Sequence, residues 1–197
     1  SPDGIVGRHQ PRHAAARQTD RVHARMRLSI AMARGLRYQA GMRFIAAWFG
    51  AAVALSLCVL LVGWTRHPTM LASLGGSCVI LFGRPDSDMA QPRSLLGGHF
   101  VAALTGLVFL ALWHAIGGPK DIWMIASVAT ALAVMMITGT THSPGGANPI
   151  VIFAEDANWS FLATPVATGA VCIFVVALLV NNYARPAPRP RYPREWR

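Results

Sequence analysis

The chain has 197 residues, of which 53% are hydrophobic and only 13% are charged. Soluble domains carry about 25% charged residues, so this composition argues against a soluble globular domain and favours helices buried in lipid. The formal net charge of +10 lies mostly in arginines at the two ends of the chain.

The N-terminal arm, residues 1–43, contains nine arginines and two acidic residues. One interpretation is a basic helix over DRVHARMRLSIAMARGLRYQAGMRF that lies on a surface of anionic lipids. The other is a partly disordered juxtamembrane arm, and an arginine-rich, acid-poor start is also typical of organelle transit peptides. Aromatic residues do not alternate with the arginines, so nucleic-acid binding is not expected.

Four apolar runs are long enough, or nearly so, to cross a membrane, because a hydrocarbon layer of about 30 Å requires about 20 helical residues. The runs cover residues 44–64, 95–116, 122–139 and 161–180. We therefore predict an all-α, polytopic membrane bundle over residues 44–182 with four full transmembrane helices. The cysteines lack CxxC spacing and are interpreted as small buried residues. They are Cys58, Cys78 and Cys172.

Two shorter apolar elements, residues 69–83 and 141–154, lie between the long runs. The first is about 22 Å long if helical, which is short for a full crossing. Each contains a glycine pair and begins near a histidine and a proline, and both glycine and proline disfavour a continuous helix. We therefore predict two short Gly/Pro-broken membrane segments. Because each stands between two long runs, we also predict a 3+3 inverted repeat.

The charges beside these elements bear on the topology. If both short elements cross the membrane, Arg84 and Arg93 share one side with both basic ends of the chain. If both are re-entrant, Arg66, Arg84 and Arg93 lie on the opposite side. The positive-inside rule favours six crossings modestly. Both termini, including the basic Pro-rich tail at residues 183–197, are expected in the cytoplasm, and the expected membrane is a bacterial inner membrane.

The two short elements are candidates for the walls of a central anion-binding site. Irregular backbone leaves N–H groups free, and glycines let a small solute approach them closely. The alternative is that the glycines only let helices pack closely. The candidate substrate-binding residues are Ser73, Gly75, Gly76, Ser77, Gln91, Arg93, His99, His142, Ser143, Gly145, Gly146 and Asn148.

Three residues of this set have two interpretations each. Arg93 attracts an anion, or it only anchors its helix at the membrane interface. His99 and His142 exchange a proton, or they form helix–helix hydrogen bonds, and Asn148 is a polar partner near His142. Gln91 is expected to hold the loop before Arg93.

The remaining histidines carry less information. His67 and His114 lie near predicted ends of spans and are expected at the interface. Among His67, His99, His114 and His142, no pair has HxxxH or HxxH spacing. We therefore expect neither a metal site, nor a cofactor, nor an enzyme.

Three separated motifs resemble the HPP family of small integral membrane proteins. They are ASLGGSCVILFGRPDSDMAQPRSLLGGH, THSPGGANPI and RYPREW. The resemblance covers roughly residues 41–197. The family's His-Pro-Pro segment is here His142-Ser143-Pro144, and the serine lacks the fixed φ of a proline and could offer a hydroxyl to a solute. The resemblance implies a multi-pass membrane protein, and some relatives are associated with nitrite transport.

The expected function is transport of a small inorganic anion such as nitrite, either facilitated or coupled to protons. The alternative is a non-transporting accessory or assembly subunit of a larger membrane complex. Small residues such as Ala102, Ala103 and Gly106 offer a stripe for helix packing, so a homo-oligomer is expected.

Overall fold

The computed structural model describes residues 11–62, 68–186 and 191–196, and it describes side chains from Arg25 onward except those of Leu28 and Val62. His67, expected at the interface, lies outside the described residues. By its internal contacts the chain divides into two units, residues 1–42 and 43–197, and each is described by itself. No strand occurs among the described residues.

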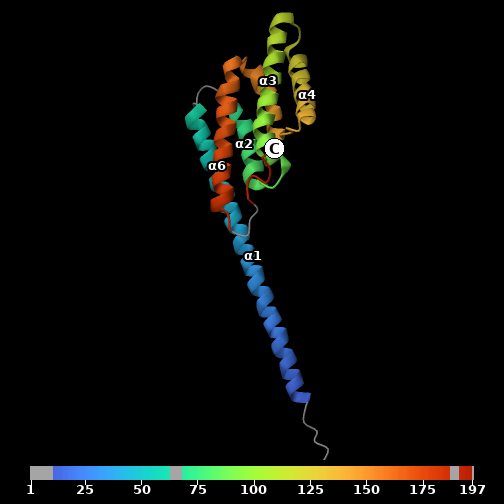
Figure 1. Cartoon of the computed structure of the whole chain (residues 1–197), viewed down its shortest axis with the longest axis vertical. Coiled ribbons are helices and arrows are strands. Elements are labelled where there is room, and N and C mark those ends of the chain that lie inside the picture. Colours follow the sequence, from blue (N-terminus) through green and yellow to red (C-terminus); the bar gives the residue numbers. More distant parts are fainter. Residues whose placement is uncertain (1–10, 63–67, 187–190, 197) are drawn as a thin grey trace, which may run out of the picture. The chain divides into compact units, whose positions relative to one another are not determined.

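The N-terminal unit contains the first part of one helix, α1 (Pro11–Val62), which is drawn in blue in Figure 1. From Arg25 to Met42 almost all described side chains are exposed. This stretch of the backbone is helical, and both interpretations of the basic arm stay predictions. Binding of this helix to anionic lipids stays a prediction.

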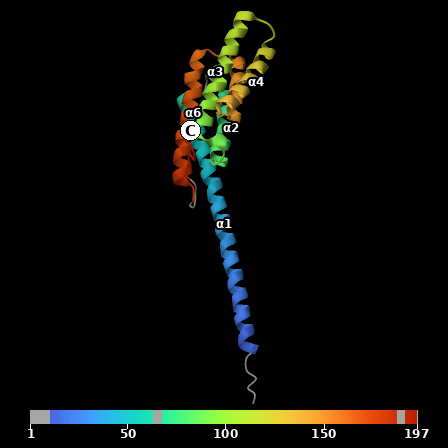
Figure 2. The same cartoon turned by 45° about the vertical axis from the view of Figure 1, so that its right-hand side comes forward.

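Four helical segments are long and apolar enough to cross a membrane, which confirms the predicted all-α bundle with four full spans. They are Arg25–Leu61 within α1, α3 (Pro92–Ile116), α4 (Lys120–Thr138) and Trp159–Ala184. The last combines η3 (Trp159–Leu162), η4 (Ala163–Ala167), α6 (Thr168–Leu179) and η5 (Val180–Ala184). In Figure 1 and Figure 2, α3 lies between α4 and α6.

Glycines end α3 and α4. Gly117 has φ of 82° at the end of α3, and Gly139 has φ of 64° at the end of α4. Residues with a side chain rarely adopt these left-handed conformations. The turn between the helices is closed by two indole N–H groups, since Trp113 donates to Gly118 O and Trp123 donates to Gly117 O, each at 3.0 Å. The two helices therefore form a tight antiparallel hairpin.

The first short segment differs from the sequence-based prediction. It forms α2 (Met70–Gly83), a 14-residue α-helix that continues through Gly75 and Gly76, so the predicted break is wrong here. Glycine costs only about 1 kcal/mol relative to alanine inside a helix, and tertiary packing overrides a preference of that size. A Cβ added at Gly76 would lie 3.2 Å from Pro144 Cβ. This glycine therefore serves close packing between the two short segments.

The second short segment changes helix type along its length. It consists of a 3-10 turn, η2 (Ser143–Ala147), followed by an eight-residue helix, α5 (Asn148–Glu155). Pro144 and Pro149 stand in the first turns of these elements, where the N–H that proline lacks has no helical partner in any case. One segment is thus a continuous helix and the other is not, so the inverted repeat stays a prediction.

The two short segments pack side by side in antiparallel directions. The Thr69 hydroxyl donates to the Glu155 carboxylate, which joins the start of α2 to the end of α5. Farther along α2, Ser73 contacts Pro144 O at 2.7 Å, and Ser77 lies opposite His142. Residues that are 65 to 86 positions apart in the sequence therefore face each other between Thr69 and Ser77.

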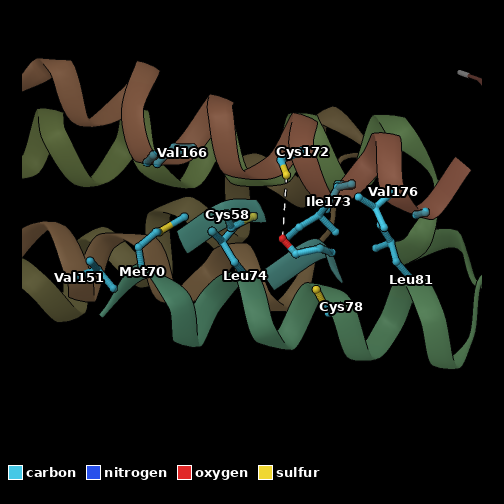
Figure 3. Close-up of a cluster of buried hydrophobic side chains, with 14 of the residues drawn as sticks. Cys58, Met70, Leu74, Cys78, Leu81, Val151, Val166, Cys172, Ile173 and Val176 are labelled. Carbon is cyan, nitrogen blue, oxygen red and sulfur yellow. Dashed lines mark hydrogen bonds between the residues drawn. The ribbon is translucent and has the colours of Figure 1, made fainter. Parts of the chain in front are cut away.

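The apolar core joins residues of α2, α3, α5 and α6 with Ala54 and Cys58 of α1. Figure 3 shows Cys58, Cys172 and Ile173 in one part of this core, with the Cys172 thiol pointing toward α1. The Cys172 thiol points at Ala54 O at 4.0 Å, and the Cys58 thiol points at Gly169 O at 3.7 Å. Cys78 is also buried, and all three cysteines are free. The prediction that they are small buried residues is confirmed.

Candidate functional site

Five polar side chains meet inside the bundle, and we call them the polar cluster. Ser73 and Ser77 come from α2, His99 from α3, His142 from the residue before η2, and Asn148 from the start of α5. None is more than 2% exposed. Ser73 and Ser77 are four residues apart, which places both on one face of their helix. All five were singled out in the sequence as polar residues in apolar surroundings.

Ser77 stands at the centre of the cluster. Its Oγ lies 2.8 Å from Nε2 of His99 and 2.8 Å from Nε2 of His142. The two imidazole rings are 5.0 Å apart between centroids and tilted by 52°. One hydroxyl therefore joins two histidines that come from different helices.

The hydrogen-bond partners determine which ring nitrogens carry protons. Nδ1 of His142 lies 2.8 Å from Met89 O, and because a carbonyl only accepts, Nδ1 must be protonated. With both rings neutral, Nε2 of His142 accepts from Ser77. Ser77 has then given away its one proton, so it accepts from Nε2–H of His99. Nδ1 of His99 in turn accepts from the Asn148 amide at 3.2 Å.

Asn148 and Ser73 complete the cluster. The Asn148 Nδ2 group also donates to His99 O at 3.0 Å. Its Oδ1 lies 2.8 Å from Ser73 Oγ, and Pro144 O lies 2.7 Å from the same hydroxyl, so the Ser73 proton has two acceptors. Ser77 Oγ likewise has a second acceptor, Ser73 O, at 3.2 Å. The cluster therefore contains more acceptor positions than protons, and it can take up one further proton without losing a hydrogen bond.

Glycines let the backbone of η2 reach α3. A Cβ added at Gly98 would lie 2.5 Å from His142 Cβ and 2.7 Å from Thr140 O. A Cβ added at Gly145 would lie 3.1 Å from the carbonyl carbon of Gly98. Real Cβ atoms essentially never come as close as the Gly98 distances, and the Gly145 distance is tighter than almost all real Cβ contacts. Gly98 and Gly145 therefore bring His142 within reach of Ser77 and His99.

Other predicted site residues lie outside the cluster. Arg93 is exposed, and its Nη2 donates to Thr138 O at 2.5 Å. The end of α4 is the negative end of its helix dipole, so this position also stabilises the guanidinium charge. This contact ties the start of α3 to the end of α4. Both interpretations of Arg93, attraction of an anion and anchoring at the membrane interface, stay predictions. Ser143 is exposed. A Cβ added at Gly75 or Gly146 would meet no atom within 4 Å.

Gln91 is buried but also stands apart from the cluster. Its Nε2 donates to Pro85 O at 3.1 Å and to Ser87 O at 2.9 Å, and its Oε1 accepts from the backbone N–H of Arg194 at 2.8 Å. Gln91 therefore holds the loop before Arg93, as expected from the sequence.

Several contributions to the site have no signal in the sequence. Met89 takes part through its carbonyl, which every residue type has. Gly98 was visible only as one of two small residues before His99.

His114 is distant from the cluster and pairs with Asp156 at 2.7 Å, with both side chains more than half exposed. Within the described part of the chain, no three His, Cys, Asp or Glu side chains converge as metal ligands would.

Asn148 supports the cluster at His99. Replacing Asn148 with leucine leaves His99 Nδ1 without its donor, and one buried unpaired group costs about 1–3 kcal/mol. We expect this variant to lose about 1–3 kcal/mol of stability, measured by denaturation of the purified protein in detergent. Ser127→Ala is the control, because the Ser127 hydroxyl is buried but donates only to Met124 O of its own helix. Equal stability of the two variants would contradict the assignment of Asn148.

Comparison with known proteins places the chain in a family. A family model described as "HPP, transmembrane region" matches residues 38–193. Two transmembrane proteins of Dictyostelium discoideum are each 32% identical to the chain, over 127 and 131 residues. The matches cover 62% and 64% of this chain but only 45% and 41% of those proteins. The chain therefore spans less than half the length of these curated relatives. No solved structure matches.

Proposed function

The chain belongs to the HPP transmembrane family and is an integral multi-pass membrane protein, and from this premise we propose that it carries a small inorganic anion across the membrane together with a proton. The observation that carries the proposal is the polar cluster. Five wholly buried polar side chains, two of them histidines, lie among apolar helices. Ionisable residues inside a membrane domain are costly and usually mark a pathway for ions or protons.

Charge balance favours joint movement of the two ions. A bare anion or a bare proton in this position is an uncompensated buried charge, which costs many kcal/mol unless it is paired. An anion beside a protonated histidine forms a neutral pair, so the two ions reduce each other's cost of entry. The cluster contains no carboxylate, and the imidazolium is therefore the only counter-charge that its side chains provide.

The proton has a defined place in this scheme. When Nε2 of His142 is protonated, it donates to Ser77 Oγ, and the Ser77 hydroxyl turns to its second acceptor, Ser73 O. His99 continues to donate to Ser77 Oγ, which has two lone pairs. Each short contact again contains one proton. His142 therefore takes up the proton at the cost of one hydroxyl rotation.

The continuous α2 changes how the anion is held. Free main-chain N–H groups are not available in the middle of an unbroken helix, so the sequence-based idea of amide donors from both segments does not apply to α2. The proposed support for the anion is the positive charge of protonated His142, whose two N–H groups are bonded to Met89 O and Ser77 Oγ. The serine hydroxyls donate to the anion when they turn away from their present acceptors. Nitrite is the substrate suggested by the family resemblance, and it remains to be tested among other small anions.

The test is a flux assay with the full chain in liposomes. We expect nitrite, nitrate, formate, bicarbonate or chloride uptake to be faster when the outside is more acidic, and a protonophore to remove the difference. Protein-free liposomes give the baseline, because nitrite and formate also cross lipid as neutral acids. Absence of protein-dependent flux for every anion would contradict transport, and flux unaffected by the pH gradient would contradict proton coupling.

One observation favours the second candidate, a non-transporting accessory subunit. With both histidines neutral, the donors of the cluster are satisfied within the protein and need no solute. The sole role of a cluster of this kind would then be to fix the packing of α2, α3 and α5. Absence of flux, combined with strong destabilisation by the cluster variants, would favour this role.

A further inference from the structure

The C-terminal segment 191–196 lies against the turn that leads into α3. This turn contains η1 (Asp88–Ala90) and ends at Gln91. The Tyr192 side chain is only 5% exposed, and its hydroxyl donates to Ala90 O at 2.7 Å. Residues about 100 positions apart in the sequence are thus joined at this point.

Gln91 joins the same two segments a second time. Its Oε1 accepts from the backbone N–H of Arg194 at 2.8 Å and from that of Glu195 at 3.3 Å. Its Nε2 donates back to Pro85 O and Ser87 O. One buried amide therefore closes the turn on itself and fastens it to the C-terminal segment.

Tyr192 is itself held from the other side. Its N–H donates to Asn182 Oδ1 at 2.9 Å, and its carbonyl accepts from Asn182 Nδ2 at 2.6 Å. Its ring lies 6.4 Å from that of Phe174. Burial raises the pKa of the Tyr192 phenol, so the hydroxyl stays protonated and remains a donor to Ala90 O. The C-terminal segment is thus a fixed support for the turn.

The turn also carries a backbone acceptor for one residue of the polar cluster, His142. Met89 precedes Ala90 directly, and Met89 O accepts from Nδ1–H of His142 at 2.8 Å. We propose that segment 191–196, acting through Tyr192, positions the Met89 carbonyl and thereby selects the Nδ1–H tautomer of His142. Tyr192 is then a positioning residue for the proton site, although it touches no member of the cluster.

This arrangement has a consequence that rests on the proposed function. With Nδ1 of His142 committed to Met89, a proton can enter only at Nε2, the nitrogen that faces Ser77 and His99. The other titratable group in contact with His142 is His99. If the C-terminal segment is displaced, Met89 O is less firmly placed, and Nε2–H becomes available to neutral His142. The C-terminal segment therefore determines which ring nitrogen of His142 takes up the proton.

The tautomer can be observed directly in the full chain. We propose nitrogen-15 NMR of the histidine-labelled protein in nanodiscs, with the His142 signals assigned by their loss in His142→Gln. In the unmodified chain we expect a protonated Nδ1 and an unprotonated Nε2. In Tyr192→Phe, which removes one hydroxyl, we expect a second set of signals in which these roles are exchanged. Tyr183→Phe is the control, because the Tyr183 side chain is exposed and lies outside this contact.

A second variant guards against compensation by Gln91. Replacing residues 191–196 with glycine and serine keeps the chain length and removes the Tyr192 side chain. The backbone N–H groups from which Gln91 Oε1 accepts are then no longer anchored by Tyr192. Here we expect the Nε2–H form of His142 to predominate. An unchanged His142 tautomer in both variants would overturn the proposal. Because this measurement needs no flux, a chain that transports nothing would contradict the proposed function and leave the tautomer result to decide this inference alone.

Discussion

Replacing Ser77 with alanine is expected to lower proton-coupled anion flux by roughly a hundredfold, the lower end of what a positioned proton-transfer group contributes. Among the described residues, Ser77 is the only side chain within hydrogen-bond distance of both histidines of the polar cluster, at 2.8 Å each. Its hydroxyl is also the group that must rotate when His142 is protonated. Alanine removes the acceptor for the protonated nitrogen, so the proton has no hydrogen-bonded place at Nε2.

The same substitution should also destabilise the protein. Nε2 of His99 and Nε2 of His142 both lose their partner, and two buried unpaired groups cost about 2–5 kcal/mol together. Flux must therefore be normalised to folded protein, measured by size-exclusion chromatography of the reconstituted sample.

Two variants separate the hydroxyl from general packing. Ser77→Thr keeps a hydroxyl and should retain most of the pH-dependent flux. Ser127→Ala removes an equally buried hydroxyl that bonds only within α4, and it should leave the flux unchanged. Full proton-coupled flux in Ser77→Ala would show that the proton does not pass through this hydroxyl.

Gly98 and Gly75 are expected to respond in opposite directions to the same change. A Cβ at Gly98 would lie 2.5 Å from His142 Cβ and 2.7 Å from Thr140 O. Neither neighbour is the flexible end of a long side chain, so α3 and the segment before η2 must move apart. We expect Gly98→Ala to cost about 1–3 kcal/mol through overpacking. It should also reduce flux, because separation of these segments draws His142 away from Ser77.

Gly75→Ala is the matched control, since it places the same methyl group in a helix of the same bundle. No atom lies within 4 Å of the added Cβ, so no neighbour has to move. Alanine is favoured over glycine by about 1 kcal/mol inside a helix, and we expect a gain of that order. The stabilities are compared by denaturant titration in one detergent. Equal effects of the two substitutions would contradict the close approach at Gly98.

Much of the fold could be predicted from the sequence because it depends on composition over long windows. A run of about 20 apolar residues has no stable place except in lipid or a core, so the four spans were visible without any tertiary information. The members of the polar cluster were visible for a related reason. A serine, histidine or asparagine inside an apolar element needs a hydrogen-bond partner, and this requirement follows from the residue type alone.

The continuous helix α2 could not be predicted from local sequence preferences. Gly75 and Gly76 disfavour a helix, but the preference is small compared with the packing of α2 on η2 and α6. The role of Arg93 was equally open in the sequence, because an arginine at the start of a helix can attract an anion or anchor its helix at the membrane interface. Its bond to Thr138 O depends on where α4 ends in space.

Composition and hydropathy were enough to identify a membrane-embedded helical protein with a few polar residues that must find partners inside it. Which partners those are depends on how the elements pack, and this could not be read from the sequence. Ser77, His99 and His142 come from three separate elements, and their meeting depends on the close approach at Gly98 and Gly145. The protonated nitrogen of His142 depends on the carbonyl of Met89, and a carbonyl is the same in every residue, so only its position in the fold gives it a role.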